Sequence, residues 1–313
     1  MRNPIPHGSM WCRATASDFR SSGWHGWIGL LLIAIFWPLN WFLPGLRTHL
    51  LFFPLWLGYI LTVDALVLHR SPPSLLARSP RDFAMLFIVS APVWWLFEAL
   101  NWRTANWEYL GRQFFSNTEY FLLASVNFSI VIPAVFSTAE LMGTFDWIDR
   151  FAHGPRVRPT PRLLWGLFLT GRAMLGLLLI WPHAFYPFVW TSVFFILEPV
   201  NVWLGKRSIL SGLQRGDWRT VAALATGVLV AGFFWEMWNS FSYPKWVYHV
   251  PFFGFWHIFE MPLPGFLGYV PFALELYVVA HLLLPRPPLL RFHRSARRAL
   301  HRQISEPGHE SLS

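Results

Sequence analysis

Six acidic residues lie within or at the ends of long apolar stretches of this 313-residue sequence. They are Asp64, Glu98, Glu140, Glu198, Glu236 and Glu275. Placing an aspartate at the centre of a membrane helix costs at least about 2.5 kcal/mol, so each carboxyl group should face the protein interior and have a partner there. An apolar environment favours the neutral carboxyl group, which can donate a proton. These residues could therefore perform acid–base chemistry; hydrogen bonding to neighbouring helices, or pairing with Arg172, is the structural alternative.

Two of the six belong to a repeated pattern of carboxylate, carboxamide and aromatic residues. Glu98 and Glu236 are each followed three residues later by an asparagine, which places both groups on one helix face. A Trp-x-Tyr turn follows each pair, and we expect its side chains to pack beside the Glu and Asn of the same half, because buried Tyr and Trp seek hydrogen-bond partners. We predict as catalytic residues Glu236, Asn239, Glu98 and Asn101, and as substrate-binding residues Trp95, Trp107, Tyr109, Trp235, Trp246, Tyr248, His249 and His257. The alternative is a buried polar clamp inside an aromatic belt at the membrane interface.

The segment 249–262 is too apolar for a free loop and too short to span a membrane. We predict that it is re-entrant or interfacial and covers Glu236. The corresponding turn of the first half carries Arg103 and Glu108, which can neutralise each other in water. The second half is therefore expected to carry the main site, with Glu236 holding the proton and Asn239 orienting it.

No cofactor is expected from the sequence motifs. His249, His257 and Glu260, together with Glu236, could ligate a metal in principle, but no His-Glu-x-x-His pattern is present and we predict no metal site. The sequence contains neither a P-loop nor a Gly-x-Gly-x-x-Gly fingerprint. Its single cysteine excludes a disulfide or a cysteine-pair redox site within one chain.

The composition requires that a membrane position these residues. Hydrophobic residues make up 54% of the chain, charged residues only 13%, and there are 20 Trp and 30 Phe. This excludes a conventional soluble enzyme. We predict an all-α polytopic membrane helix bundle, because a spanning helix needs about 20 apolar residues. The expected spans are about 27–44, 49–68, 82–101, 119–143, 163–181, 184–204, 219–240 and 264–284.

The basic residues predict the orientation. The net charge of +9 is spread over short segments between apolar runs and the C-terminal tail, whereas a nucleic-acid-binding protein would carry one basic face. Arg and Lys favour cytoplasmic loops. We therefore predict that both termini are cytoplasmic and that the chain lies in the inner membrane. The expected partners are the lipid bilayer and a lipophilic small molecule, with no nucleic acid; the sequence predicts no oligomeric state.

The two halves of the sequence match each other. Trp56, Asp64 and Ser74 recur at an offset of 134 as Trp190, Glu198 and Ser208. The Glu, Asn, Trp and Tyr of the repeated pattern recur at offsets of 138 and 139. Four spans per repeat is an even number, so the repeats should be parallel. The expected organisation is an N-terminal segment 1–23, four-helix repeats 24–150 and 151–285, and a basic tail 286–313.

The stretches Glu98 to Tyr109 and Glu236 to Glu275 resemble, in motif style, the membrane-embedded lycopene cyclases and carotenoid hydratases. More generally, the chain is similar to multi-pass bacterial membrane proteins. The Pro-x-Glu-Glu or Pro-x-Glu-Asp element of those cyclases is absent, and Phe259-Glu260-Met261-Pro262 is not a substitute for it. The resemblance implies acid-initiated chemistry on an isoprenoid.

Three functional classes remain open from the sequence. An acid–base enzyme acting on an isoprenoid or other lipid-soluble substrate should have Glu98 or Glu236 at an apolar cavity. A proton-linked transporter or channel should have a polar path from Asp64 and Glu198 to these residues. A lipid- or pigment-binding scaffold should have every carboxylate satisfied and no cavity.

The topology predicts the outcome of reporter fusions. Fusions after residues 75, 155, 212 and 300 should report the cytoplasm, and fusions after residues 112 and 252 the opposite side, because positively charged loops stay cytoplasmic. Alkaline phosphatase and green fluorescent protein fusions measure the two outcomes. An odd number of spans would contradict both the orientation and the parallel repeats.

Overall fold

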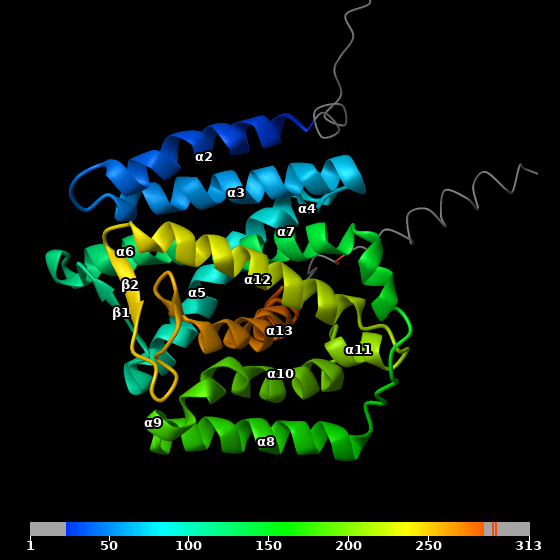
Figure 1. The fold of residues 1–313 in the computed structure, drawn as a ribbon. Coiled ribbons are helices and arrows are strands. Elements are labelled where there is room, and N and C mark those ends of the chain that lie inside the picture. Colours follow the sequence, from blue (N-terminus) through cyan, green and yellow to red (C-terminus); the bar gives the residue numbers. More distant parts are fainter. Residues whose placement is uncertain (1–22, 285–289, 291, 293–313) are drawn as a thin grey trace, which may run out of the picture.

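The computed structural model describes residues 23–284, 290 and 292, so the expected N-terminal segment (except Gly23) and most of the basic tail lie outside the described residues. The chain forms an all-α helix bundle (Figure 1). Seven of its described helices are long and apolar enough to cross a membrane, and one bent pair could form an eighth span. This confirms the predicted fold class.

The first half of the bundle begins with two long helices, α2 (Trp24–Phe42) and α3 (Thr48–Arg70). They are followed by the short α4 (Leu75–Arg78), the long α5 (Pro80–Thr104), strand β1 (Trp107–Leu110) and the 3-10 helix η1 (Arg112–Phe114). The span expected at 119–143 is made of α6 (Asn117–Phe128) and α7 (Val131–Gly143). Serine side chains cap α5 and α6, where Ser79 accepts from Asp82 N and Ser116 forms a capping box with Glu119.

The second half begins with the 3-10 helix η2 (Asp146–Phe151) and the long α8 (Pro161–Ile180). The short α9 (Pro182–Phe185) and η3 (Tyr186–Trp190) then precede α10 (Ser192–Trp203), α11 (Ile209–Leu213) and the long α12 (Arg219–Ser240). Strands β2 (Lys245–Tyr248), β3 (His257–Ile258) and β4 (Met261–Pro262) lead through η4 (Leu263–Gly265) into α13 (Phe266–Leu283).

The span expected at 184–204 is bent. The α9–η3 segment and α10 meet at 42°. The amide groups of Val193 and Phe194, at the start of α10, donate to Glu275 Oε1 at 3.0 and 3.4 Å. A break in a membrane helix is tolerated when the protein supplies partners for the freed backbone groups, and Glu275 supplies one here.

The helices lie in layers. Figure 1 shows α2 and α3 at one edge of the bundle and α8 at the opposite edge, with α12 and α13 between them. The β1–β2 ribbon lies at one end of these helices, and α11 lies toward the other. The innermost side chains are large; Trp56, Phe97 and Trp238 are almost completely buried.

The central helices α7 and α12 touch through small residues. A Cβ added to Gly227 would lie 2.5 Å from the backbone N and Cα of Ala139. Small residues allow close helix approach in membrane proteins. The two helices carry Glu140 and Glu236, so this contact sets the separation of elements that hold buried carboxyl groups.

Gly227→Ala should therefore lower the free energy of unfolding by about 1–3 kcal/mol, because overpacking forces the backbones apart. Gly176→Ala in α8 is the control, since no atom lies within 4 Å of the added Cβ. Unfolding in mixed detergent, followed by circular dichroism, measures both. Equal stability of the two variants would contradict a rigid α7–α12 contact.

Candidate functional site

Glu98 of α5 lies inside a ring of neutral hydrogen-bond donors. Its Oε1 accepts from Trp94 Nε1 at 2.8 Å, Trp107 Nε1 at 3.0 Å and the Tyr109 hydroxyl at 2.6 Å. Glu98 is only 4% exposed. The predicted contact between this carboxylate and its Trp-x-Tyr sequence is confirmed. No cation takes part in these three bonds, so the carboxyl group is held without an ion pair.

Glu236 of α12 has the corresponding surroundings in the second half. Its Oε1 accepts from the hydroxyl groups of Tyr248 at 2.7 Å and Tyr269 at 2.6 Å. Trp246 Nε1 donates to the Tyr248 hydroxyl at 2.9 Å. Glu236 is completely buried, and its Oε2 has no hydrogen-bond partner among the described residues. A proton on Oε2 would leave both tyrosine bonds intact.

The two asparagines hold the backbone of the strands. Asn239 donates from Nδ2 to Trp246 O at 2.8 Å and accepts from Trp246 N at 3.0 Å. Asn101 likewise donates to Trp107 O at 2.7 Å and accepts from Asn106 N at 2.9 Å. Each carboxamide therefore replaces a strand partner and aims the Trp-x-Tyr side chains at the carboxylate of the same half.

The Trp-x-Tyr sequences are strands, which corrects their interpretation as turns. Strands β1 and β2 pair antiparallel, with Trp107 opposite Tyr248 and Tyr109 opposite Trp246. The ribbon brings together two clusters that are 138 residues apart in the sequence. Within the described part of the chain, neither strand pairs with a strand of its own half, so the pairing joins the halves at the site.

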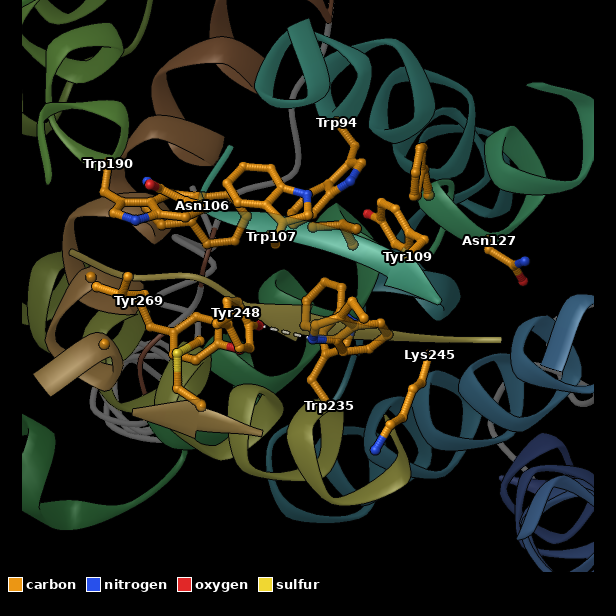
Figure 2. Close-up of a pocket in the computed structure, with 18 of the residues that line it drawn as sticks. Trp94, Asn106, Trp107, Tyr109, Asn127, Trp190, Trp235, Lys245, Tyr248 and Tyr269 are labelled. Carbon is orange, nitrogen blue, oxygen red and sulfur yellow. Dashed lines mark hydrogen bonds between the residues drawn. The ribbon is translucent and has the colours of Figure 1, made fainter. Parts of the chain in front are cut away.

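The ribbon forms part of the wall of an aromatic cavity of about 480 Å³ (Figure 2). This volume falls within the range of about 300–1,000 Å³ that is usual for small-molecule sites. Its lining includes Trp94, Trp107, Tyr109, Trp190, Trp235, Trp246, Tyr248, Tyr269 and Phe272. The tyrosine that donates to Glu98 and the two that donate to Glu236 therefore form part of the cavity wall. The two carboxylates lie behind these tyrosines.

The tyrosine hydroxyl groups keep their protons. Burial, reinforced by the negative charge of Glu98, raises the pKa of Tyr109 well above its ordinary value of 10.0. Burial likewise raises the pKa of Tyr248 well above its ordinary value. At neutral pH both side chains are therefore donors, and each can link its carboxyl group to the cavity.

The structure does not bring all predicted site residues to the cavity. The four predicted catalytic residues lie behind its wall rather than in it. Trp95 faces α6, where its Nε1 donates to Ser125 Oγ at 2.9 Å. His249 pairs with Glu108 at 2.9 Å, and His257 is exposed in β3. The other five predicted binding residues, Trp107, Tyr109, Trp235, Trp246 and Tyr248, line the cavity.

The expected pairing of Arg103 with Glu108 is wrong. Arg103 donates to the carbonyl groups of Leu179 and Ile180 at the end of α8, and Glu108 contacts His249 instead. The carbonyl groups at a helix end lack partners within the helix, which explains this preference. The first-half turn is therefore tied to the second half rather than to itself.

The segment 249–262 forms turns and the small β3–β4 hairpin beside the cavity. Val250, Phe253 and Met261 line the cavity, whereas Phe252 and Trp256 are 69% and 75% exposed. Lys245 pairs with Glu260. No cluster of three or more potential metal ligands occurs in the part of the chain that the structure describes.

The remaining four carboxylates hold the fold together. Asp64 accepts from the Ser74 hydroxyl at 2.6 Å and Leu76 N at 3.0 Å, and it also contacts His25 at 3.2 Å. Glu198 accepts from Ile209 N and Leu210 N, at the start of α11. Glu275 caps α10, and Glu140 pairs with Arg78. Arg172, a possible partner under the structural alternative, is exposed and lies over the Phe168 ring.

The predicted site residues omit several that the structure places at the site, among them Tyr269 and Trp190. Tyr269 donates to Glu236 from α13, and Trp190 stacks on Trp107 with ring centroids 5.6 Å apart. Trp190 recurs at an offset of 134 from Trp56, and that match could have drawn attention to it. No signal in the sequence connects Tyr269 with a residue 33 positions earlier.

No protein-family model, curated protein or solved structure matches this chain.

The asparagine clamps can be tested through stability. Asn239→Ala or Asn101→Ala leaves a strand N–H and C=O group without partners, which should lower the free energy of unfolding by about 1–3 kcal/mol. Gln113→Ala removes an exposed amide from the loop after β1 and is the control. The unfolding midpoint in detergent measures the effect. A stability loss with Gln113→Ala as large as that with Asn239→Ala would contradict the clamp.

Proposed function

We propose that the chain is an integral membrane protein that binds a lipid-soluble, unsaturated small molecule and acts on it by acid–base chemistry. The observation that carries this proposal is the position of the tyrosine hydroxyl groups. Tyr109, Tyr248 and Tyr269 line the cavity and donate to the carboxyl groups behind its wall. A proton can therefore move between a carboxyl group and a ligand through one hydroxyl group.

Such a transfer needs a turn of the Tyr248 hydroxyl hydrogen and a turn of the Glu236 carboxyl group, which brings the proton on Oε2 to the tyrosine oxygen. The Tyr248 hydroxyl hydrogen turns from Glu236 toward the cavity and protonates a carbon–carbon double bond of the ligand. The Glu236 carboxyl group then donates its proton to the tyrosine oxygen. Loss of a neighbouring proton from the ligand cation by the reverse route returns the proton to Glu236 and leaves an isomerised or cyclised product. The reaction consumes no oxidant or reductant.

Aromatic rings support the cationic intermediate of this reaction. The faces of Trp and Phe rings attract cations, most strongly where water is excluded. Trp94, Trp190 and Phe272 all line the cavity; Trp94 and Phe272 lie with ring centroids 5.8 Å apart, and Trp190 and Phe272 lie 5.4 Å apart. An isoprenoid is the substrate class that combines a lipid-soluble body with double bonds that such an acid can protonate.

We assign the main proton-holding role to Glu236, with Asn239 positioning Tyr248 through the strand. Complete burial and the unpartnered Oε2 of Glu236 support this assignment. Glu98 instead receives three bonds on one oxygen, which favours a fixed carboxylate. The two related clusters would then have different roles.

The proposed parallel duplication accounts for the pair of clusters. At an offset of 139 residues, Trp107 corresponds to Trp246 and Tyr109 corresponds to Tyr248. In the ribbon, Trp107 pairs with Tyr248 and Tyr109 pairs with Trp246. This register is the one expected of a twofold relation between repeats. An even number of spans per repeat supports both termini lying on the same side of the membrane. The basic residues between the apolar runs support that side being the cytoplasm and the membrane being the inner membrane.

Glu236→Gln tests the proposal, because glutamine preserves the shape but cannot carry the proton. Purified protein in lipid nanodiscs, incubated in D₂O with unsaturated isoprenoid alcohols and hydrocarbons, should incorporate deuterium or form isomers, measured by mass spectrometry. Glu236→Gln and Tyr248→Phe should lower the rate by about 10²–10⁴-fold. Ligand binding, followed by tryptophan quenching, should persist in both variants.

Glu98→Gln is the matched control and should retain most of the activity. Loss of activity with Glu98→Gln but not with Glu236→Gln would reverse the two roles. Binding without deuterium uptake or product formation in the unaltered protein would leave a lipid- or pigment-binding scaffold instead of an enzyme.

A further inference from the structure

One end of the cavity carries a positive charge without a counter-charge. Arg112, in the loop after β1, lines the cavity. Among the described residues, no carboxylate lies within ion-pair distance of its guanidinium group. Its two hydrogen bonds go to neutral acceptors, Phe115 O at 2.8 Å and Asn117 Oδ1 at 2.5 Å. A guanidinium group has five N–H hydrogens, so donors remain for a ligand.

Lys245, the other basic residue of the same end, is already neutralised. Lys245 lies opposite Leu110 in the ribbon, and Leu110 is two residues before Arg112 in the sequence. The Lys245 Nζ pairs with Glu260. In Figure 2, Lys245 and Asn127 lie at the end of the view opposite Trp190. Of these two basic side chains, only Arg112 therefore lacks an ion-pair partner among the described residues.

The Arg112 side chain is held in place. Its guanidinium carbon lies 4.2 Å from the centre of the Tyr120 ring, within the range of a cation–π contact. His49, which packs against the Phe115 ring at 5.4 Å, also lines the cavity. Its Nδ1 is buried without a hydrogen-bond partner among the described residues, as is Asn127 Oδ1. This end combines a fixed cation with two unsatisfied polar side chains.

The loop position matches that of a lipid head group. Residues 105–116 connect the apolar helix Pro80–Thr104 with the apolar segment Asn117–Gly143, so they lie where spans leave the membrane. The remainder of the cavity is walled mainly by aromatic and other apolar side chains. Guanidinium groups bind carboxylate and phosphate groups through paired hydrogen bonds.

We propose that the ligand is an amphiphile with one anionic head group, a carboxylate or a phosphate, bound by Arg112, and with an unsaturated hydrocarbon body in the aromatic part of the cavity. This inference deepens the proposed function and rests on its claim that the cavity holds a lipophilic ligand. The inference adds that the ligand is negatively charged and that its head group lies at the Arg112 end of the cavity.

The experiment compares cis-parinaric acid with its methyl ester, two fluorescent polyenes of the same hydrocarbon body. Protein in phosphatidylcholine nanodiscs is titrated with each, and energy transfer from tryptophan reports binding. The acid should bind at least tenfold more tightly than the ester. Arg112→Gln should reduce this preference to less than about threefold, because it removes a charge-assisted hydrogen bond.

Two further variants separate the Arg112 contact from general charge. Arg112→Lys should restore most of the preference, and Arg103→Gln, which removes a charge outside the cavity, should leave it unchanged. A preference that survives Arg112→Gln, or equal binding of acid and ester by the unaltered protein, would overturn the inference and leave the proposed function standing. Displacement of the acid by millimolar inorganic phosphate alone would assign the site to a free anion. Binding of neither probe would also overturn the inference, whereas the proposed function is tested separately by the incubation with isoprenoids.

Discussion

Hydrogen bonding of carboxyl groups that are shielded from water determines much of this structure. Each of the six carboxylates within or beside the apolar helices receives partners from a different element, and those partners fix where that element begins or lies. Asp64 and Glu198 hold the first turns of α4 and α11, and Glu275 holds the first turn of the bent α10. Glu98 and Glu236 each gather aromatic donors from their own half of the chain. An unsatisfied buried charge costs several kcal/mol, so these arrangements are strongly constrained.

The same constraint connects fold and site. The aromatic donors that satisfy Glu98 and Glu236 would otherwise be free to face lipid, as indole and phenol groups commonly do at a membrane interface. Here they turn inward, and their rings become the wall of a cavity. The proposed chemistry uses bonds that the fold needs for its own stability. Removing a carboxylate or a tyrosine should therefore be assessed for folding as well as for activity, and isosteric substitutions separate the two.

Local patterns in the sequence predicted the helices and half of the site. Apolar stretches located the spans, and the three-residue spacing of Glu98 and Asn101 placed them on one face. The bend before α10 was not predicted, because its partner Glu275 lies 82 residues away. Strands β1 and β2 were not predicted, because each has only four residues and its pairing partner lies in the other half of the sequence. Tyr269 was missed because its contact depends on how α12 and α13 pack. The features that the sequence did not predict are therefore those that depend on contacts between elements far apart in the chain.

The register of the β1–β2 ribbon also has a consequence for biosynthesis. Residues paired in the ribbon are 135 to 141 positions apart, so a ribosome completes β1 well before it makes β2. At about 5–20 residues per second, the delay is roughly 7–28 s. During this time the β1 backbone lacks its strand partner, which would be very costly inside lipid. The position of the ribbon at the end of the helices (Figure 1) allows water to serve as that partner until the second half is inserted.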